Sequence, residues 1–320
     1  MAERRVAAGC VFVGHAAARD DFRLAGRRVF PVAAGIAEKL RRPHPPRLAN
    51  HGGGDDVFAE FHSKNIITKK FDLLDNVFTF DRSQEFAIKG SRAFYDGKIY
   101  LQSIASMLPT LVLNPQKWEK ILDVCAAPGS KTTQIAMLQQ NDGKIVALEQ
   151  NQIRFDKLNY NIQLQWATNI KTYKIDARKF ESAALFDKIL LDAPCSAEGR
   201  ISLQNEKSFG FWSEENILKK SQLQSELLQK FWANLRSGGE LVYSTCTLAP
   251  EENEMIIVNF LEKNVDAQIL PISLSCKNEA WWKSNIANFS NNDFSSLNGF
   301  GIRILPSEYT EWFFIVRLKK

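Results

Sequence analysis

Residues 120–131 read Lys-Ile-Leu-Asp-Val-Cys-Ala-Ala-Pro-Gly-Ser-Lys, and this stretch indicates the fold of the chain. Its first five residues form a short apolar run typical of a buried strand, and apolar residues at helical spacing follow from Ser130 to Gln140. Further strand-like runs alternate with helical segments downstream; the runs span residues 144–149, 170–176, 187–192, 240–244 and 312–316. Strands that alternate with helices predict an α/β fold with a doubly wound, mostly parallel sheet.

The overall composition agrees with a folded intracellular protein. The chain has 320 residues, of which 45% are hydrophobic and 24% charged, so it can build a core and is not disordered throughout. No stretch of about 18 consecutive apolar residues is present, which argues against a spanning helix. The five cysteines are too few for a disulfide scaffold, so we expect a reducing, cytoplasmic setting.

The amino-terminal part of the chain differs in composition from the rest. Residues 1–56 contain ten basic and six acidic residues, whereas residues 57–320 contain 31 and 30. The net charge of +5 therefore comes mostly from the first segment, and bulk charge is a poor argument for nucleic-acid binding. We predict that residues 1–56 are a poorly ordered or foreign basic extension; an RNA-contacting arm and an organelle-targeting leader are the alternatives.

Residues 57–110 are predicted to form a small α+β element, and residues 111–320 the sheet domain. A turn at Asp96-Gly97 between β-prone residues predicts a hairpin, and a short helix is expected to be interrupted at Pro109. In the sheet domain, Gly238-Gly239 is expected to end a long helix that begins near residue 213.

Residues that follow the predicted strands suggest a cofactor, because ligands of such sheets bind beyond the carboxyl ends of the strands. The loop 125–131 has small residues and a glycine that allow close backbone approach, but it matches neither a phosphate-binding loop nor a GxGxxG turn. Glu149 after the second strand is placed to accept ribose hydroxyls, and Asp176 after the third could accept from an adenine amino group. An adenosine-bearing cofactor without a phosphate requirement is predicted, and S-adenosylmethionine fits.

Two cysteines follow the fourth and fifth strands, at the same expected edge. Cys195 comes after Asp192, and Cys246 follows the strand at 240–244, so the two thiols share one crevice if those strands are neighbours. We interpret Cys10 and Cys276 as small buried hydrophobic residues. By residue chemistry alone, either Cys195 or Cys246 could be a nucleophile.

A metal site is not expected. The cysteines do not form CxxC pairs, and His62 is the only histidine after residue 56. The same scarcity of histidine argues against a Cys–His hydrolase.

Three ordered motifs carry a resemblance to a known family. They are residues 125–131, residues 192–199, and residues 244–247 followed by 251–254. From about Phe94 to Val316 the chain resembles the Fmu/Sun family of RNA (cytosine-5) methyltransferases, closest to the bacterial ribosomal-RNA branch. The resemblance implies a Rossmann-like class I S-adenosylmethionine-dependent methyltransferase. It also implies that residues 57–110 are part of an RRM-like RNA-binding domain. Trp312 departs from the family pattern, in which a small residue precedes the two phenylalanines.

The resemblance also implies roles for individual residues. Cys246 would attack cytosine C6, Cys195 would assist release of the product, and Asp192 would bind the edge of the base. Cofactor contacts are expected at Cys125, Ala126, Ala127, Pro128, Gly129, Ser130, Lys131, Glu149, Asp176 and Asp192, and at Arg154. Cys125 would support the loop through its backbone, and Lys131 would either steady the loop or approach the base.

The expected partner is an RNA, ribosomal or transfer, whose cytosine is single-stranded or flipped from its stack. A monomer without metal or membrane attachment is expected. Aromatic residues Phe209, Phe211 and Trp212 either stack on the nucleotide or pack on the sheet. Three other functions stay open. They are a DNA cytosine-5 methyltransferase attacking through Cys195, an adenine amino-methyltransferase, and a non-catalytic RNA-binding or assembly factor.

Overall fold

A computed structural model of the 320-residue chain gives the architecture. It describes residues 8–13, 55–71, 76–201, 208–210, 212–272, 282–284, 288–289, 292–297, 299–307 and 310–320. Phe211 and Cys276, which the sequence singled out, lie outside these residues.

The described part of the sheet domain is built on a nine-stranded sheet with the order β11-β14-β15-β9-β8-β5-β6-β7, and β10 pairs with β15. The four pairings among β9, β8, β5, β6 and β7 are parallel, and those of β10, β11, β14 and β15 are antiparallel. The strands span β5 Lys120–Asp123, β6 Lys144–Glu149, β7 Ile170–Lys174, β8 Phe186–Asp192, β9 Leu235–Thr245, β10 Gln268–Leu270, β11 Trp282–Ser284, β14 Ile302–Ile304 and β15 Phe313–Lys319. The predicted α/β fold with a mostly parallel sheet is confirmed.

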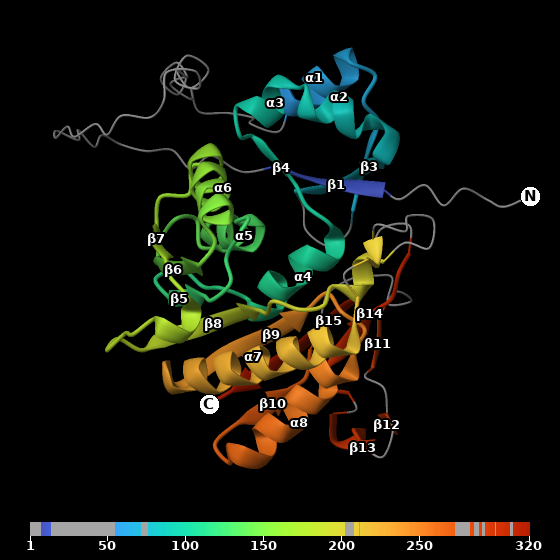
Figure 1. Ribbon diagram of the computed structural model, residues 1–320. Helices are drawn as coiled ribbons and strands as arrows, with labels where there is room; N and C mark the ends of the chain where they lie inside the picture. The colour runs from blue at the N-terminus through green and yellow to red at the C-terminus, as the bar shows by residue number, and fades with distance from the viewer. Residues whose placement is uncertain are drawn as a thin grey trace, which may run out of the picture.

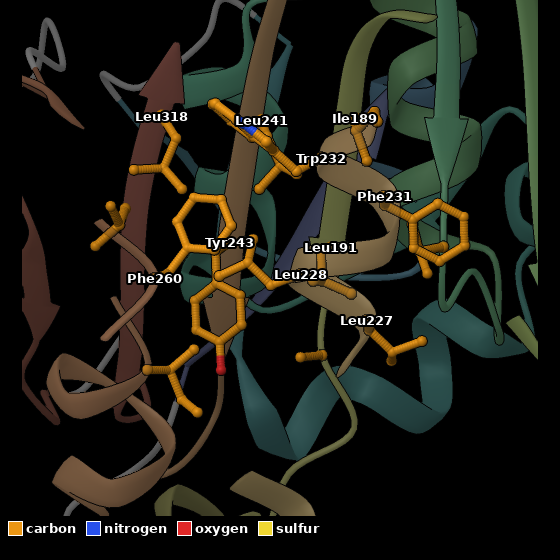
Figure 2. Packing of buried hydrophobic residues seen from close by; sticks show 14 of the residues in the cluster. Ile189, Leu191, Leu227, Leu228, Phe231, Trp232, Leu241, Tyr243, Phe260 and Leu318 are labelled. Carbon is orange, nitrogen blue, oxygen red and sulfur yellow. The ribbon is translucent and has the colours of Figure 1, made fainter. Parts of the chain in front are cut away.

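Helices cover both faces of this sheet (Figure 1). They are α4 (Ile104–Leu113), α5 (Ser130–Leu138) and α6 (Gln152–Leu164) on one face, and α7 (Glu214–Ala233) and α8 (Glu254–Lys263) on the other. Successive strand residues point to opposite faces, so Val242 packs under α4 whereas Leu241 and Tyr243 pack under α7 and α8. Figure 2 shows the hydrophobic cluster between the sheet and the helices α7 and α8, where Tyr243 lies beside Leu228 and Phe260.

A smaller sheet with the order β2-β3-β1-β4 forms the amino-terminal element, with short helices packed on it. Its elements span β1 Ala8–Val13, α1 Asp55–Ser63, β2 Thr68–Lys70, β3 Val77–Asp81, α2 Glu85–Lys89, α3 Arg92–Tyr95, and β4 Ile99–Leu101. A short two-stranded pair, β12 (Asn288–Phe289) and β13 (Asn292–Asp293), lies near the other end of the chain.

The amino-terminal element is joined to the sheet domain by direct contacts. The indole of Trp166, just after α6, donates to the carbonyl of Asp96 at 3.3 Å. Gly97 has a φ of +69°, and a Cβ there would lie 1.8 Å from the carbonyl oxygen of Leu164. This close approach requires glycine, because a side chain would collide with the backbone of α6.

Two predictions about turns are wrong. Gly238-Gly239 does not end α7, which stops at Ala233; the two glycines lie within β9, near an irregularity in its pairing with β8. Glycine with positive φ serves both helix ends and strand irregularities, and Gly238 has a φ of +72°. The predicted hairpin at Asp96-Gly97 is also wrong, since helix α3 precedes the turn and only β4 follows it.

The predicted boundaries differ from the observed elements in three places. The helix α4 continues through Pro109 without interruption and crosses the expected boundary between residues 110 and 111. Because α4 packs against the sheet face that carries Val242 of β9, it belongs to the sheet domain. We expected no regular element within residues 1–56, yet Ala8–Val13 forms β1 between β3 and β4. Its pairing partners are remote in sequence, so local pattern did not reveal it.

Candidate active site

The loop after β5 is held in place by side chains from the helix α6. Arg154 donates to the carbonyl of Ala127 at 2.6 Å, and Asn161 donates to that of Pro128 at 2.7 Å. Gly129 caps α5 with a φ of +106°, and a Cβ there would lie 3.0 Å from the side chain of Leu158. These contacts fix the main chain at the positive end of α5.

Four of the expected cofactor residues, Cys125, Glu149, Arg154 and Asp176, line one pocket beyond the ends of β5 and β6. Glu149 is 4% exposed, accepts from the backbone N–H of Asn151 at 2.8 Å, and lies 3.4 Å from Arg154. Asp176 is paired with Arg178 at 2.7 Å, and hydrogen bonds from Arg178 lower the pKa of this carboxyl. Burial raises the pKa of the Cys125 thiol well above its usual range, which keeps it protonated.

The pocket also has the apolar walls that an adenine ring requires. Ile175, Pro194 and Leu227 line it, with the two carboxylates at its edge. An adenosine group fits this donor and acceptor set, because its ring is apolar on both faces and its hydroxyl and amino groups are donors. Among the described residues, no cluster of three or more histidine, cysteine or acidic side chains is arranged to hold a metal ion.

A second group of expected residues meets where β8 and β9 end. These strands are parallel neighbours in which Asp192 lies opposite Ser244, so Cys195 and Cys246 leave the sheet side by side. The two Sγ atoms are 3.4 Å apart. The structure therefore brings the two thiols together, as the sequence predicted for neighbouring strands.

Lys131 approaches Asp192 from the helix α5. Its Nζ lies 2.7 Å from a carboxylate oxygen of Asp192 and donates to Ser106 at 3.0 Å. The other carboxylate oxygen of Asp192 accepts from the hydroxyl of Ser244 at 2.8 Å. The cation also lies 5.3 Å from the centre of the Phe313 ring. Lys131 thus contacts the acid that is expected to bind the base.

Three consecutive buried residues brace the two cysteine loops, and the sequence assigned them no role. Glu252 accepts from the N–H of Ser196, next to Cys195, at 3.1 Å. Asn253 accepts from the hydroxyl of Thr245 at 2.6 Å and donates to the carbonyl of Thr247 at 3.1 Å, so it holds both neighbours of Cys246. The one sequence signal for this bracing is that three consecutive residues, 252–254, are polar although all three side chains are buried.

Glu254, the third of these consecutive residues, forms a buried ion pair with Arg303. Glu254 receives two hydrogen bonds from Arg303, at 2.7 and 2.6 Å, and Arg303 also donates to the carbonyl of Leu248 at 3.1 Å. The turn that follows Cys246 is therefore anchored from both α8 and β14.

The aromatic residues after β8 lie near the surface. Phe209 is 39% exposed and Trp212 is 48% exposed, and the indole of Trp212 donates to Glu198 at 2.6 Å. Glu198 in turn accepts from Thr247 and from the N–H of Leu248, both at 3.1 Å. The position of Trp212 is thus linked to the Cys246 turn.

Comparisons with known proteins agree with one another. Residues 110–319 match the family model described as 16S rRNA methyltransferase RsmB/F. The ribosomal RNA small subunit methyltransferase F of Vibrio parahaemolyticus is 34% identical over 252 residues, which are 77% of this chain and 50% of that protein.

Two archaeal proteins match over more of their own length. The tRNA (cytosine(49)-C(5))-methyltransferase of Pyrococcus abyssi is 34% identical over 80% of this chain and 83% of its own. A solved structure of a methyltransferase homologue from Pyrococcus horikoshii superposes with a TM-score of 0.71 and 26% identity, covering 99% of this chain and 90% of that one. This chain therefore spans about half of the bacterial relative and most of the archaeal ones.

Proposed function

Because this chain belongs to the RsmB/F family of 16S rRNA methyltransferases, we propose that it methylates C5 of a cytosine in RNA with S-adenosylmethionine as donor. The observation that carries the proposal is the 3.4 Å separation of the Cys195 and Cys246 sulfurs at the ends of β8 and β9. A site that only binds a base, without covalent chemistry, would not require two thiols in contact with each other beside a carboxylate.

The cofactor would be held by the pocket beyond β5 and β6. Glu149 would accept from the ribose hydroxyls, Asp176 from the adenine amino group, and the loop 125–131 would contact the rest of the molecule. When bound, S-adenosylmethionine supplies an electrophilic methyl group on a sulfonium.

Cys246 would act as the nucleophile towards the base. Its thiolate forms a bond to cytosine C6, and the C5–C6 electron pair moves to C5, which becomes nucleophilic. Asp192, fixed by Lys131 and Ser244, would hold the base edge during this step. After C5 has been methylated, a base removes the C5 proton. The electron pair left behind restores the C5–C6 bond as the Sγ–C6 bond breaks and the thiolate leaves.

The two thiols are suited to different tasks. A hydrogen bond from Cys195 lowers the pKa of Cys246, whereas the same bond raises the pKa of Cys195. Cys195 would remain protonated and assist release of the product. The match to RNA methyltransferases argues against a DNA cytosine-5 methyltransferase that attacks through Cys195. The paired thiols and the cofactor pocket argue against a non-catalytic assembly factor.

The amino-terminal element would help to grip the RNA. Phe86 on α2 is 90% exposed and Ile67 is 76% exposed, with Lys69 and Lys70 on the neighbouring strand β2. Exposed aromatic and basic side chains on one small domain suit single-stranded RNA, since bases stack and phosphates pair with cations.

The proposal is tested by incubating the protein with S-adenosylmethionine and RNA, followed by bisulfite sequencing and denaturing gels. Cys195→Ala should accumulate a covalent protein–RNA adduct, and Cys246→Ala should give neither adduct nor 5-methylcytosine. Cys10→Ala, in β1, is the matched control and should keep wild-type activity. Full activity of Cys246→Ala would refute the covalent mechanism.

Transfer RNA is a second candidate substrate. It is favoured by the Pyrococcus abyssi relative, whose length this chain covers to 83%. Parallel reactions with unmodified transfer RNA and with small-subunit ribosomal RNA separate the two, since only the true substrate should gain 5-methylcytosine at one position.

A further inference from the structure

Asn253, the residue immediately before the helix α8, is completely buried beside the turn that contains Cys246. Its side-chain oxygen accepts from the Thr245 hydroxyl at 2.6 Å, and its side-chain nitrogen donates to the Thr247 carbonyl at 3.1 Å. An asparagine at this position usually accepts from a backbone N–H in the first turn of its helix, but the Asn253 side chain makes no such bond. Its amide instead links the two residues on either side of Cys246.

The sheet alone does not hold this turn. The strand β9 ends at Thr245, so Cys246 and Thr247 lie beyond the last residue that pairs with β15. The Cys246 carbonyl is fixed on another side by the N–H of Gly199, which donates to it at 2.9 Å. Asn253 ties the Thr247 carbonyl back to the last residue of the strand, and so extends the order of the sheet past the cysteine.

Asn253 is itself attached to a rigid part of the molecule. The carbonyl of Glu252, in the peptide group that joins the two residues, accepts from the hydroxyl of the buried Tyr243 at 2.6 Å. The Glu252 carboxylate accepts from the N–H of Ser196, which follows Cys195, at 3.1 Å. The same short segment therefore holds both cysteine loops, and a support of this kind is what a precise site requires.

We propose that Asn253 is a positioning residue that holds Cys246 against Cys195 for attack on the base. This inference rests on the covalent function proposed above and deepens it. Without the Asn253 amide, the residues on either side of Cys246 lose their shared partner, and the sulfur is no longer confined to one position. A displacement of about 1 Å can cost about a hundredfold in rate, so the loss should fall on kcat.

The first test compares two buried asparagines at opposite ends of α8. Asn253→Ala should lower kcat for RNA methylation by about a hundredfold. Its KM for RNA and its affinity for S-adenosylmethionine should stay near wild type, because other residues line the cofactor pocket. Asn264→Ala is the matched control, since Asn264 is 8% exposed and exchanges hydrogen bonds of 3.0 and 2.9 Å with Gln229. This control should lower the melting temperature and keep kcat.

The second test changes the partner of the amide. Thr245→Val keeps the shape of the side chain but removes the hydroxyl that donates to Asn253, so it should reproduce the loss of kcat. Thr245→Ser retains a hydroxyl and should recover most of the rate. The double variant with Asn253→Ala should lose no more than Asn253→Ala alone, because the two residues act through one hydrogen bond.

The third test reads the position of the two sulfurs without turnover. Phenylarsine oxide reacts with two neighbouring thiols, forming two As–S bonds while its oxygen leaves with both thiol protons as water. The Cys195 and Cys246 sulfurs, 3.4 Å apart, should bind it in the wild type, and Cys195→Ala should remove this binding. Asn253→Ala should weaken it by about fivefold or more, because a loosened pair must be ordered on binding.

A kcat of Asn253→Ala equal to that of the wild type would overturn the assignment, and so would an equal loss of kcat in Asn264→Ala. Unchanged affinity of Asn253→Ala for phenylarsine oxide would also overturn it. If Asn253→Ala does not fold, the contrast between Thr245→Val and Thr245→Ser decides by the same two measurements. Arsenical binding that weakens as expected, in a protein whose wild type forms no 5-methylcytosine, would refute the proposed function alone.

Discussion

The buried pair between Arg303 and Glu254 offers a sharp test of how the Cys246 turn is held. Their side chains are 9% and 0% exposed, and two hydrogen bonds of 2.7 and 2.6 Å join them. Replacing Arg303 by methionine leaves the Glu254 carboxylate buried without its cation. Removing one partner of a buried pair costs about 3–5 kcal/mol, because an uncompensated charge stays in the core.

The assay is urea unfolding of the wild type, Arg303→Met, Glu254→Gln and the double variant. Each single variant should lower the free energy of unfolding by about 3–5 kcal/mol, and the double variant should recover a large part of that loss. Arg236→Met is the control, because Arg236 is 48% exposed and pairs with Asp187 at 2.6 Å on the surface. Its cost should stay below about 1 kcal/mol.

A loss of less than about 1 kcal/mol in both single variants would refute the reasoning, since the pair would then behave as a surface contact. Equal losses in the double and single variants would instead show that packing, and not charge pairing, stabilises this site.

Three further outcomes are expected. Burial raises the pKa of Asp123 from its usual 3.8 to about 7. Between about pH 4 and 7 the native protein keeps the Asp123 carboxyl protonated, whereas the unfolded chain does not. The contribution of this carboxyl to the free energy of unfolding therefore falls as pH rises from about 4 to 7 and stays low above that. Asp123→Asn should remove this component in urea titrations at several pH values; parallel wild-type and variant curves would contradict it. Glu149→Gln should weaken S-adenosylmethionine binding by about tenfold or more in calorimetry, because hydrogen bonds to a charged group are worth about 1.5–3 kcal/mol, and unchanged affinity would remove Glu149 from the site. Gly129→Ala should lower the melting temperature and cofactor affinity together, because its φ of +106° disfavours a side chain and Leu158 lies 3.0 Å from the added Cβ; a melting temperature equal to wild type would contradict this.

The sequence predicts these site residues well because the ends of strands are marked by local patterns. Asp192, Cys195 and Cys246 follow apolar runs, and parallel neighbours deliver their carboxyl ends to one edge. Gly238 was misassigned, because a helix end and a strand irregularity need the same backbone conformation. β1 was missed because its partner strands lie far along the chain.

Charged neighbours of the thiols could not be predicted in the same way. Glu252 reads as an acid in the first turn of a helix, whereas the structure buries it under the Cys195 loop. Its position depends on a contact between segments 56 residues apart.

The start of α4, which joins the amino-terminal element to the sheet domain, contacts residues of the candidate active site. Ser106, in the first turn of α4, accepts from Lys131, which pairs with Asp192. Ser103 donates to a carboxylate oxygen of Glu311 at 3.0 Å. A catalytic domain defined from residue 111 would lack both serines and most of α4. A domain that contains all of these contacts therefore has to begin before α4. The amino-terminal element, which we propose binds RNA, leads through β4 directly into this helix, whose first turn contacts Lys131, the partner of Asp192.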